Sequence, residues 1–308
     1  MKKGLFTAGV LALITLSACN ENTDETEGIA AENDADEQTI YVTTSFSVLA
    51  DYIEQVVGDR GEVDYIVPRH EEPHEYEPVP SDFEKVSDSE VFYINGLNLE
   101  EWLEGLVENV GDIPVVELAA EAEPIELREG GVYDPHVWLS PEEAPLYIEA
   151  LVEDLSERDP DGADEYRENA DAYLEELEDL HAWTEEQMEE VAEEHRLIVT
   201  SENAFEYFGR SYGLDTEGVW EINSHEEGTP GQVARLVDVI NDREVPALFK
   251  ETTVSPDYIE TVSENTGVEI SGEVYTDSVG EEGSGAEDYI SMIEHNVETF
   301  RAGLAESE

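Results

Sequence analysis

The middle of the chain contains about 32 consecutive residues, 163–194, without a glycine or a proline. Apolar or small side chains recur there every three or four residues, which is the spacing of one face of an α-helix. The residues on this face are Tyr166, Ala170, Tyr173, Leu177, Leu180, Thr184, Met188 and Val191. A helix of this length would extend about 48 Å, more than the width of a small domain. The stretch therefore predicts a helix that packs across two lobes. The alternative, a coiled-coil helix, is disfavoured because the face is short of Leu and Ile.

Short β-rich runs alternate with amphipathic stretches on both sides of this helix. The predicted strands are 40–44, 63–67, 91–94 and 115–118 before it, and 196–200, 218–222, 246–250 and 268–274 after it. The predicted helices between and after them are 48–57, 99–110, 204–212, 230–241, 256–266 and 286–304. Such alternation is typical of parallel sheets covered by helices. We therefore predict an α/β fold with two lobes, each a mainly parallel sheet flanked by helices, joined by one long rigid α-helix.

A further helix is predicted immediately before the long one. Ser140 and Pro141 suit the N-cap and the first helical position, and Glu143 follows in the first turn. The pattern ends near Arg158, because Pro160 cannot continue a helix. The predicted organisation of the folded part is an N-terminal lobe at 39–160, a linking helix at 161–195 and a C-terminal lobe at 196–308.

The first residues have the features of a processing signal. Two lysines precede an apolar run, 5–16, that is too short to span a bilayer comfortably. The run ends in Leu-Ser-Ala before Cys19, a pattern that resembles the bacterial lipobox, so we predict a signal peptide at 1–18 and lipidation of Cys19. The alternative is an ordinary signal peptide with an incidental cysteine. Cys19 is the only cysteine in the chain, so no internal disulfide is available. Residues 19–38 are acidic and almost without apolar side chains, which predicts a flexible tether.

The charge of the chain excludes some partners. Lys and Arg number 14 against 79 Asp and Glu, a formal net charge of −65. Nucleic acids and anionic membrane surfaces attract clustered basic side chains, so neither is an expected partner of the folded part. We interpret the acidity as an adaptation to salty surroundings, where salt screens the repulsion.

Side chains that can coordinate a metal stand where predicted strands end or loops follow. They are His74, His136, Glu202 and Asp277. Ligands of open α/β sheets bind beyond the carboxyl ends of the strands, so these positions suit a binding site. Each residue alone is weak evidence, since a histidine after a proline is more often on the surface and glutamate is abundant in so acidic a chain.

Five ordered motifs add more specific evidence. They are PHEYEP at 73–78, NGLNLE at 95–100, DPHVWL at 134–139, WEIN at 220–223 with EEGTP at 226–230, and YTDSV at 275–279. In this order they resemble the metal-binding lipoproteins of bacterial ABC importers, the solute-binding family for manganese, zinc and iron. The resemblance covers about 39–304 and implies two lobes joined by one rigid helix.

The resemblance also implies a site and a role. The family's ligands correspond to His74 and His136 from the N-terminal lobe, and to Glu202 and Asp277 from the C-terminal lobe. It implies a monomeric carrier that is anchored through Cys19 at the outer face of the cytoplasmic membrane. Such a carrier delivers its metal to an ABC permease.

The third ligand position separates the subgroups of this family. Zinc-specific members usually have a histidine there, and many have a His-rich loop before the second ligand. Here the residue is Glu202 and 119–133 contains no histidine, so the resemblance implies Mn²⁺, with Zn²⁺ or Fe²⁺ as alternatives. The family usually has Gly four residues and Asp two residues before the first histidine, where this chain has His70 and Glu72.

The remaining histidines are interpreted as non-ligands. His70 is expected to be a solvated loop residue, with an accessory ligand as the alternative, and His225 is expected on the surface. His181, His195 and His295 are interpreted as structural residues on predicted helices or at their ends.

The donor set suits a hard or borderline divalent ion. Two imidazoles and two carboxylates are accepted by Mn²⁺ and Fe²⁺ and tolerated by Zn²⁺.

Two functions other than metal transport fit the sequence less well. A metallohydrolase would need an open coordination position and a positioned base, and no His-Glu-x-x-His or Gly-x-Ser-x-Gly motif occurs, so we predict no enzyme. A role in surface adhesion would leave the four aligned ligands unexplained.

Overall fold

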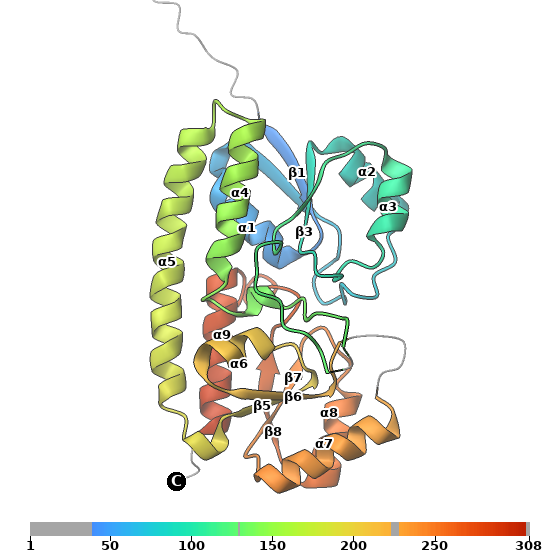
Figure 1. The fold of residues 1–308 in the computed structure, drawn as a ribbon, viewed down its shortest axis with the longest axis vertical. Coiled ribbons are helices and arrows are strands. Elements are labelled where there is room, and N and C mark those ends of the chain that lie inside the picture. Colours follow the sequence, from blue (N-terminus) through green and yellow to red (C-terminus); the bar gives the residue numbers. More distant parts are fainter. Residues whose placement is uncertain (1–38, 129, 223–227, 306–308) are drawn as a thin grey trace, which may run out of the picture. The chain divides into compact units, whose positions relative to one another are not determined.

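The computed structural model of the chain describes residues 39–128, 130–222 and 228–305. The predicted signal peptide, Cys19, the tether and His225 lie outside these residues. Figure 1 shows two α/β lobes, with helix α5 (Ala163–Glu189) running alongside both of them. The predicted fold class is confirmed. Within the described residues, no helix combines the length and apolar character that a membrane span requires.

The N-terminal lobe is built on a four-stranded parallel sheet in the order β2-β1-β3-β4. The strands are β1 (Ile40–Thr44), β2 (Gly61–Tyr65), β3 (Val91–Ile94) and β4 (Val115–Glu117), and the helices are α1 (Ser47–Val57), α2 (Pro80–Asp88) and α3 (Leu103–Val110). All four residues of β3 are buried because helices cover both faces of the sheet. Phe92 and Ile94 pack with residues of α2 and α3, whereas Val91 and Tyr93 pack with the main core that includes α1.

The C-terminal lobe contains two parallel strand pairs, β5-β6 and β7-β8, which lie side by side through β5 and β7. The strands are β5 (Leu197–Glu202), β6 (Asp215–Trp220), β7 (Leu248–Glu251) and β8 (Ile270–Val274). The helices are α6 (Glu206–Tyr212), α7 (Pro230–Arg243), α8 (Asp257–Thr266) and α9 (Tyr289–Leu304). Leu197 and Val199 pack with side chains of α7 and α8, and Ile198 joins the core with α9. The strands thus direct alternate side chains to opposite covered faces.

Helix α5 buries the face that its sequence predicts, from Tyr166 to Met188. It ends at Glu189, five residues before the end of the stretch without Gly or Pro. The guanidinium group of Arg196 donates to the backbone oxygens of Met188, Glu189 and Val191, which satisfies carbonyls at the end of the helix. The rest of the predicted linking segment contains the 3-10 turn η3 (Glu193–His195).

Two local predictions were wrong or incomplete. Helix α4 covers Ala144–Arg158, so Ser140 is not its N-cap. The hydroxyl group of Ser140 instead lies 2.8 Å from the hydroxyl group of Ser211 on α6, a partner that is distant in the sequence. Helix α2 was not predicted, although Pro80 starts it and the carboxylate of Asp82 accepts a hydrogen bond from the N–H of Val79.

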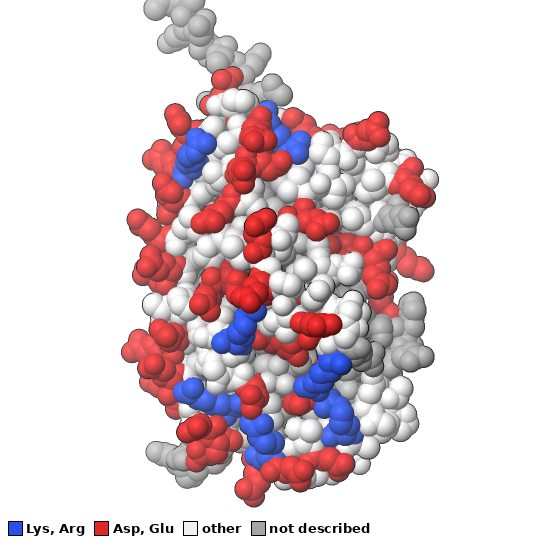
Figure 2. Space-filling model, viewed as in Figure 1, with Lys and Arg blue, Asp and Glu red and all other residues white. Residues whose placement is uncertain are grey.

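Acidic side chains cover much of the surface, as Figure 2 shows for one face. On α5, Asp171, Glu175 and Asp179 are exposed and follow one another at intervals of four residues. Like charges at this spacing are neighbours on a helix and destabilise it. Salt would screen this repulsion.

We expect the melting temperature to rise by on the order of 10 °C between about 0.1 M and 1 M NaCl, because the screening length shortens from about 10 Å to about 3 Å. Differential scanning calorimetry of the metal-free protein measures this rise. The triple variant Asp171→Asn, Glu175→Gln and Asp179→Asn should show a weaker salt dependence. A flat melting temperature over this range would show that charge repulsion does not limit stability.

Candidate metal centre

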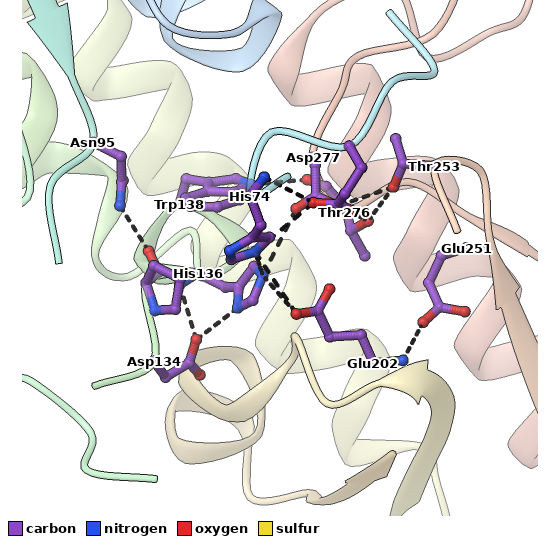
Figure 3. A network of polar contacts seen from close by, with 12 residues as sticks. His74, Asn95, Asp134, His136, Trp138, Glu202, Glu251, Thr253, Thr276 and Asp277 are labelled. Atoms are coloured by element: carbon purple, nitrogen blue, oxygen red, sulfur yellow. Dashed lines mark hydrogen bonds and ion pairs between the residues drawn. The ribbon is translucent and has the colours of Figure 1, made fainter. Parts of the chain in front are cut away.

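The four candidate ligands come from segments that end or follow strands and meet between the lobes. His74 lies in the loop between β2 and α2, and His136 immediately precedes the 3-10 turn η2 (Val137–Leu139). Glu202 is the last residue of β5, and Asp277 is the third residue after β8. Figure 3 shows their side chains pointing toward one another. Glu202 and Asp277 therefore lie at the carboxyl ends of strands, where open α/β sheets bind their ligands.

Four pairs of donor atoms are close enough for the two atoms to share one ion. The Nε2 atoms of His74 and His136 are 3.3 Å apart. Oε1 of Glu202 lies 3.7 Å from the first of them and 3.9 Å from the second. Oδ1 of Asp277 lies 3.7 Å from Nε2 of His136. Two atoms that each lie about 2.1 Å from a common ion are at most about 4.2 Å apart, so these separations fit a single divalent metal.

Burial makes the site an unfavourable place for uncompensated charge. The side chains of His74, His136, Glu202 and Asp277 are at most 3% exposed. Oδ1 of Asp277 makes no hydrogen bond, although a buried carboxylate oxygen normally has a partner. A divalent cation would supply the missing interaction.

Asp134 determines which ring nitrogen of His136 is free to bind a metal. Oδ1 of Asp134 lies 2.7 Å from Nδ1 of His136 and also accepts a hydrogen bond from its backbone N–H. Because an ionised carboxylate can only accept, Nδ1 carries the proton and Nε2 directs its lone pair into the site. Burial opposes a charge on this ring, but the carboxylates of Asp134 and Asp277 outweigh that effect and raise the pKa of His136.

His74 has the opposite electrostatic environment. Burial, followed by the proximity of His136, holds the pKa of His74 well below its usual value. The ring is therefore neutral at pH 7, and no proton has to leave before a metal binds. Its backbone N–H donates to Oε1 of Glu72, which lies 3.9 Å from the Nε2 atom of the same ring.

Glu202 is positioned by its backbone. Its N–H donates to Oε1 of Glu251, at 2.7 Å, from the last position of the neighbouring strand β7. Burial raises the pKa of Glu251 to about 7, although the N–H groups of Glu202 and Ser201 act in the opposite direction. On the other side, a side chain at Gly218 would meet backbone atoms of Asn203 and Trp220 at 2.5–2.6 Å. The close approach of β6 to the end of β5 therefore requires glycine at this position.

Asp277 is oriented by two hydroxyl groups. Thr253 and Thr276 donate to its Oδ2 atom at 2.9 Å and 2.7 Å. These bonds leave Oδ1 directed toward His136. The indole N–H of Trp138 donates to the carbonyl oxygen of Thr276, which links the His136 segment to the Asp277 segment across the two lobes.

The 95–100 motif supports the segment that contains His136. The side-chain amide of Asn95 donates to the carbonyl oxygen of Pro135, and Tyr147 donates to the side-chain oxygen of Asn95. The carboxylate of Glu100 accepts hydrogen bonds from Ser45 and from the backbone N–H groups of Asn95 and Gly96. This motif is therefore a structural support and contributes no donor atom to the cluster.

The other histidines that the structure describes lie outside the donor cluster. His70 is about half exposed and 3.6 Å from a carboxylate oxygen of Glu281. The other three each lie within hydrogen-bonding distance of a neighbouring element: His181 with Tyr212, His195 with the carbonyl of Leu304, and His295 with the carbonyl of Glu273. These contacts agree with the prediction that His181, His195 and His295 are structural residues.

Sequence reasoning missed Glu72 as a candidate donor. The structure groups a carboxylate oxygen of Glu72 with those of Glu202 and Asp277, all within 4.8 Å of one another. A second group, within the same limit, joins His74, His136 and Glu202. The sequence could have suggested Glu72 as a donor because it stands two residues before His74, the first histidine of the site.

The chain is similar to known metal-binding proteins over most of its length. The family model described as "zinc-uptake complex component A periplasmic" matches residues 42–303. The manganese-binding lipoprotein MntA of Halalkalibacterium halodurans is 52% identical over 301 residues, which cover 98% of both chains. The manganese ABC transporter substrate-binding lipoprotein PsaA of Streptococcus pneumoniae is 34% identical over 317 residues, covering 99% of this chain and all of the relative.

A solved structure shares the fold. The periplasmic zinc-binding protein TroA from Treponema pallidum superimposes with a TM-score of 0.82 at 26% sequence identity. The match covers 87% of this chain and all of that protein. The relatives' names thus include both a manganese and a zinc protein.

Proposed function

This chain belongs to the zinc-uptake complex component A family, and on that premise we propose that it carries Mn²⁺ outside the cytoplasmic membrane to an ABC permease. The observation that most supports a carrier is the convergence of two imidazole nitrogens and two carboxylates from both lobes on one buried point. Such a site binds one ion and removes it from water. We propose no catalytic role, because the four donors take the positions that a catalytic water would need.

We propose that His74, His136, Glu202 and Asp277 bind the ion directly. The hydrogen bonds of Asp134, Thr253 and Thr276 hold two of these side chains in orientation before the ion arrives. Such preorganisation contributes to affinity because partners of this kind typically change metal binding by about 10- to 100-fold. In the same proposal, 39–160 and 196–308 are the two lobes and 161–195 is the segment that links them.

The choice of Mn²⁺ rests on the hard oxygen donors and on the names of the two lipoproteins MntA and PsaA. Zinc is the second candidate, because the family description and the name of TroA both refer to zinc. Affinity alone does not decide between them, since Zn²⁺ generally binds a given N/O site more tightly than Mn²⁺. Supply and release to the permease would then determine the cargo.

Growth of the native host with this gene deleted tests the cargo. In metal-limited medium, the deletion should slow growth, and added Mn²⁺ should restore it. Rescue by Zn²⁺ with no effect of Mn²⁺ would assign the protein to zinc import. The control is the same strain carrying the intact gene on a plasmid.

Replacing Glu202 with histidine should raise the affinity for Zn²⁺ relative to Mn²⁺ by roughly tenfold, because a borderline nitrogen replaces a hard oxygen. Competitive titration against a chelator with both ions measures the ratio. The Glu176→His variant adds the same imidazole at an exposed position of α5, outside the donor cluster, and serves as the control. An unchanged ratio in Glu202→His would exclude Glu202 from the coordination sphere.

We also propose that Cys19 is lipidated and holds the carrier at the outer face of the membrane. Two or three acyl chains give stable attachment, whereas one chain gives only reversible binding. The Cys19→Ala variant should therefore appear in the culture medium or remain unprocessed, as judged by fractionation and mass spectrometry. A cleaved Cys19→Ala protein that stays in the membrane fraction would contradict lipidation at this residue.

A further inference from the structure

Glu72 stands at the outer edge of the donor cluster. Its side chain is 20% exposed, whereas that of His74 is 3% exposed and those of Glu202 and Asp277 are at most 1% exposed. One of its oxygens lies within 4.8 Å of oxygens from both Glu202 and Asp277. Among these four side chains, that of Glu72 is thus the most accessible to solvent.

The loop that carries Glu72 is fastened to the opposite lobe. The guanidinium group of Arg69 donates to the carbonyl oxygen of Gly280 at 2.6 Å, three residues after Asp277. Two residues after Glu72, the N–H of His74 donates to Oε1 of Glu72 at 3.2 Å. These two contacts hold the Glu72 carboxylate beside the two metal-facing acids.

A second observation at this point indicates a cation. The side chain of Asp277 is fully buried, and its Oδ1 atom faces the cluster without a hydrogen bond. Three carboxylates at this separation repel one another unless a positive charge lies between them. An ion bound near Asp277 and Glu202 would therefore come within reach of Glu72 as well.

We propose that Glu72 is a fifth metal ligand, which converts a two-nitrogen, two-oxygen site into one with a third carboxylate. This inference rests on the proposed function and extends it to selectivity. Zn²⁺ prefers four ligands in a tetrahedron, whereas harder ions accept more oxygen donors. A fifth ligand that supplies a third carboxylate oxygen thus favours Mn²⁺ relative to Zn²⁺.

The Glu72→Gln variant tests the proposal by titration with Mn²⁺ alone and Zn²⁺ alone. The Mn²⁺ affinity should fall roughly tenfold or more, and the Zn²⁺ affinity should fall less. Glu71→Gln is the matched control, because Glu71 is the exposed neighbour of Glu72 and loses the same charge. In the Co²⁺-substituted protein, Glu72→Gln should strengthen the visible absorption, because four-coordinate Co²⁺ absorbs more strongly than five-coordinate Co²⁺.

Glu72→Asp separates ligation from a purely electrostatic effect, because it keeps the charge and shortens the side chain by one methylene. Ligation predicts that this variant loses Mn²⁺ affinity as Glu72→Gln does. The inference would be overturned if Glu72→Asp binds Mn²⁺ as tightly as the wild type. It would also be overturned if Glu72→Gln and Glu71→Gln lose the same Mn²⁺ affinity. Failure of the wild-type protein to bind any ion would instead contradict the proposed function.

Discussion

Replacing His136 with alanine should abolish most of the stabilisation that a metal confers on the protein. The wild type at a free metal concentration 100 times its Kd gains about 2.7 kcal/mol, because the ion binds only the folded state. Loss of a ligand that lowers affinity roughly 100-fold would reduce this gain to about 0.4 kcal/mol. Thermal unfolding with and without Mn²⁺ measures the gain within each variant, so a change in the metal-free stability does not interfere.

Two further variants make this test specific. His70→Ala removes an exposed histidine from the same loop as His74 and should retain the full metal-dependent gain. His136→Asn keeps an N–H donor for Asp134 at the position of Nδ1 but removes the metal-facing nitrogen, so it should fold well and still lose the gain. If His70→Ala loses the gain while His74→Ala retains it, the assignment of the first ligand is wrong.

Replacing Trp138 with alanine should cost about 3–5 kcal/mol of unfolding free energy, the usual range for a buried aromatic residue. Trp138 is fully buried, packs its ring against Phe46 with the centroids 4.9 Å apart, and donates to the carbonyl oxygen of Thr276. Because Trp138 connects the His136 segment to the Asp277 segment, the variant should also bind metal more weakly. Denaturant unfolding of the metal-free protein in 1 M salt measures the first effect, and titration measures the second.

Trp138→Phe separates packing from hydrogen bonding. It retains an aromatic ring but leaves the Thr276 carbonyl without this donor, which should cost about 1–3 kcal/mol. Trp183→Ala is the control, since Trp183 is only partly buried on α5 and lies outside the site. It should cost less and leave the metal affinity unchanged. If Trp138→Ala and Trp183→Ala lose equal amounts of metal affinity, Trp138 does not couple the two lobes.

Local patterns in the sequence determined much of the fold. The strands β1 and β3 begin and end where their β-rich runs predict, because all of their side chains except that of Tyr41 are buried. The buried face of α5 follows from the three- and four-residue spacing of its apolar side chains. The four candidate ligands could be selected because ordered motifs mark the loops after strands, where α/β sheets bind their ligands.

Tertiary structure decided the features that depend on residues far apart in the chain. Ser140 does not cap α4, and its hydroxyl group lies instead beside that of Ser211 on α6. The partners that orient the site, such as Glu251 for Glu202, come from neighbouring strands that no local pattern connects. The approach of Glu72 to Glu202 and Asp277 likewise exists only once the two lobes have packed. Side-chain identity sets which atoms can bind a metal, but the distances among them arise from contacts between segments that are separate in the sequence.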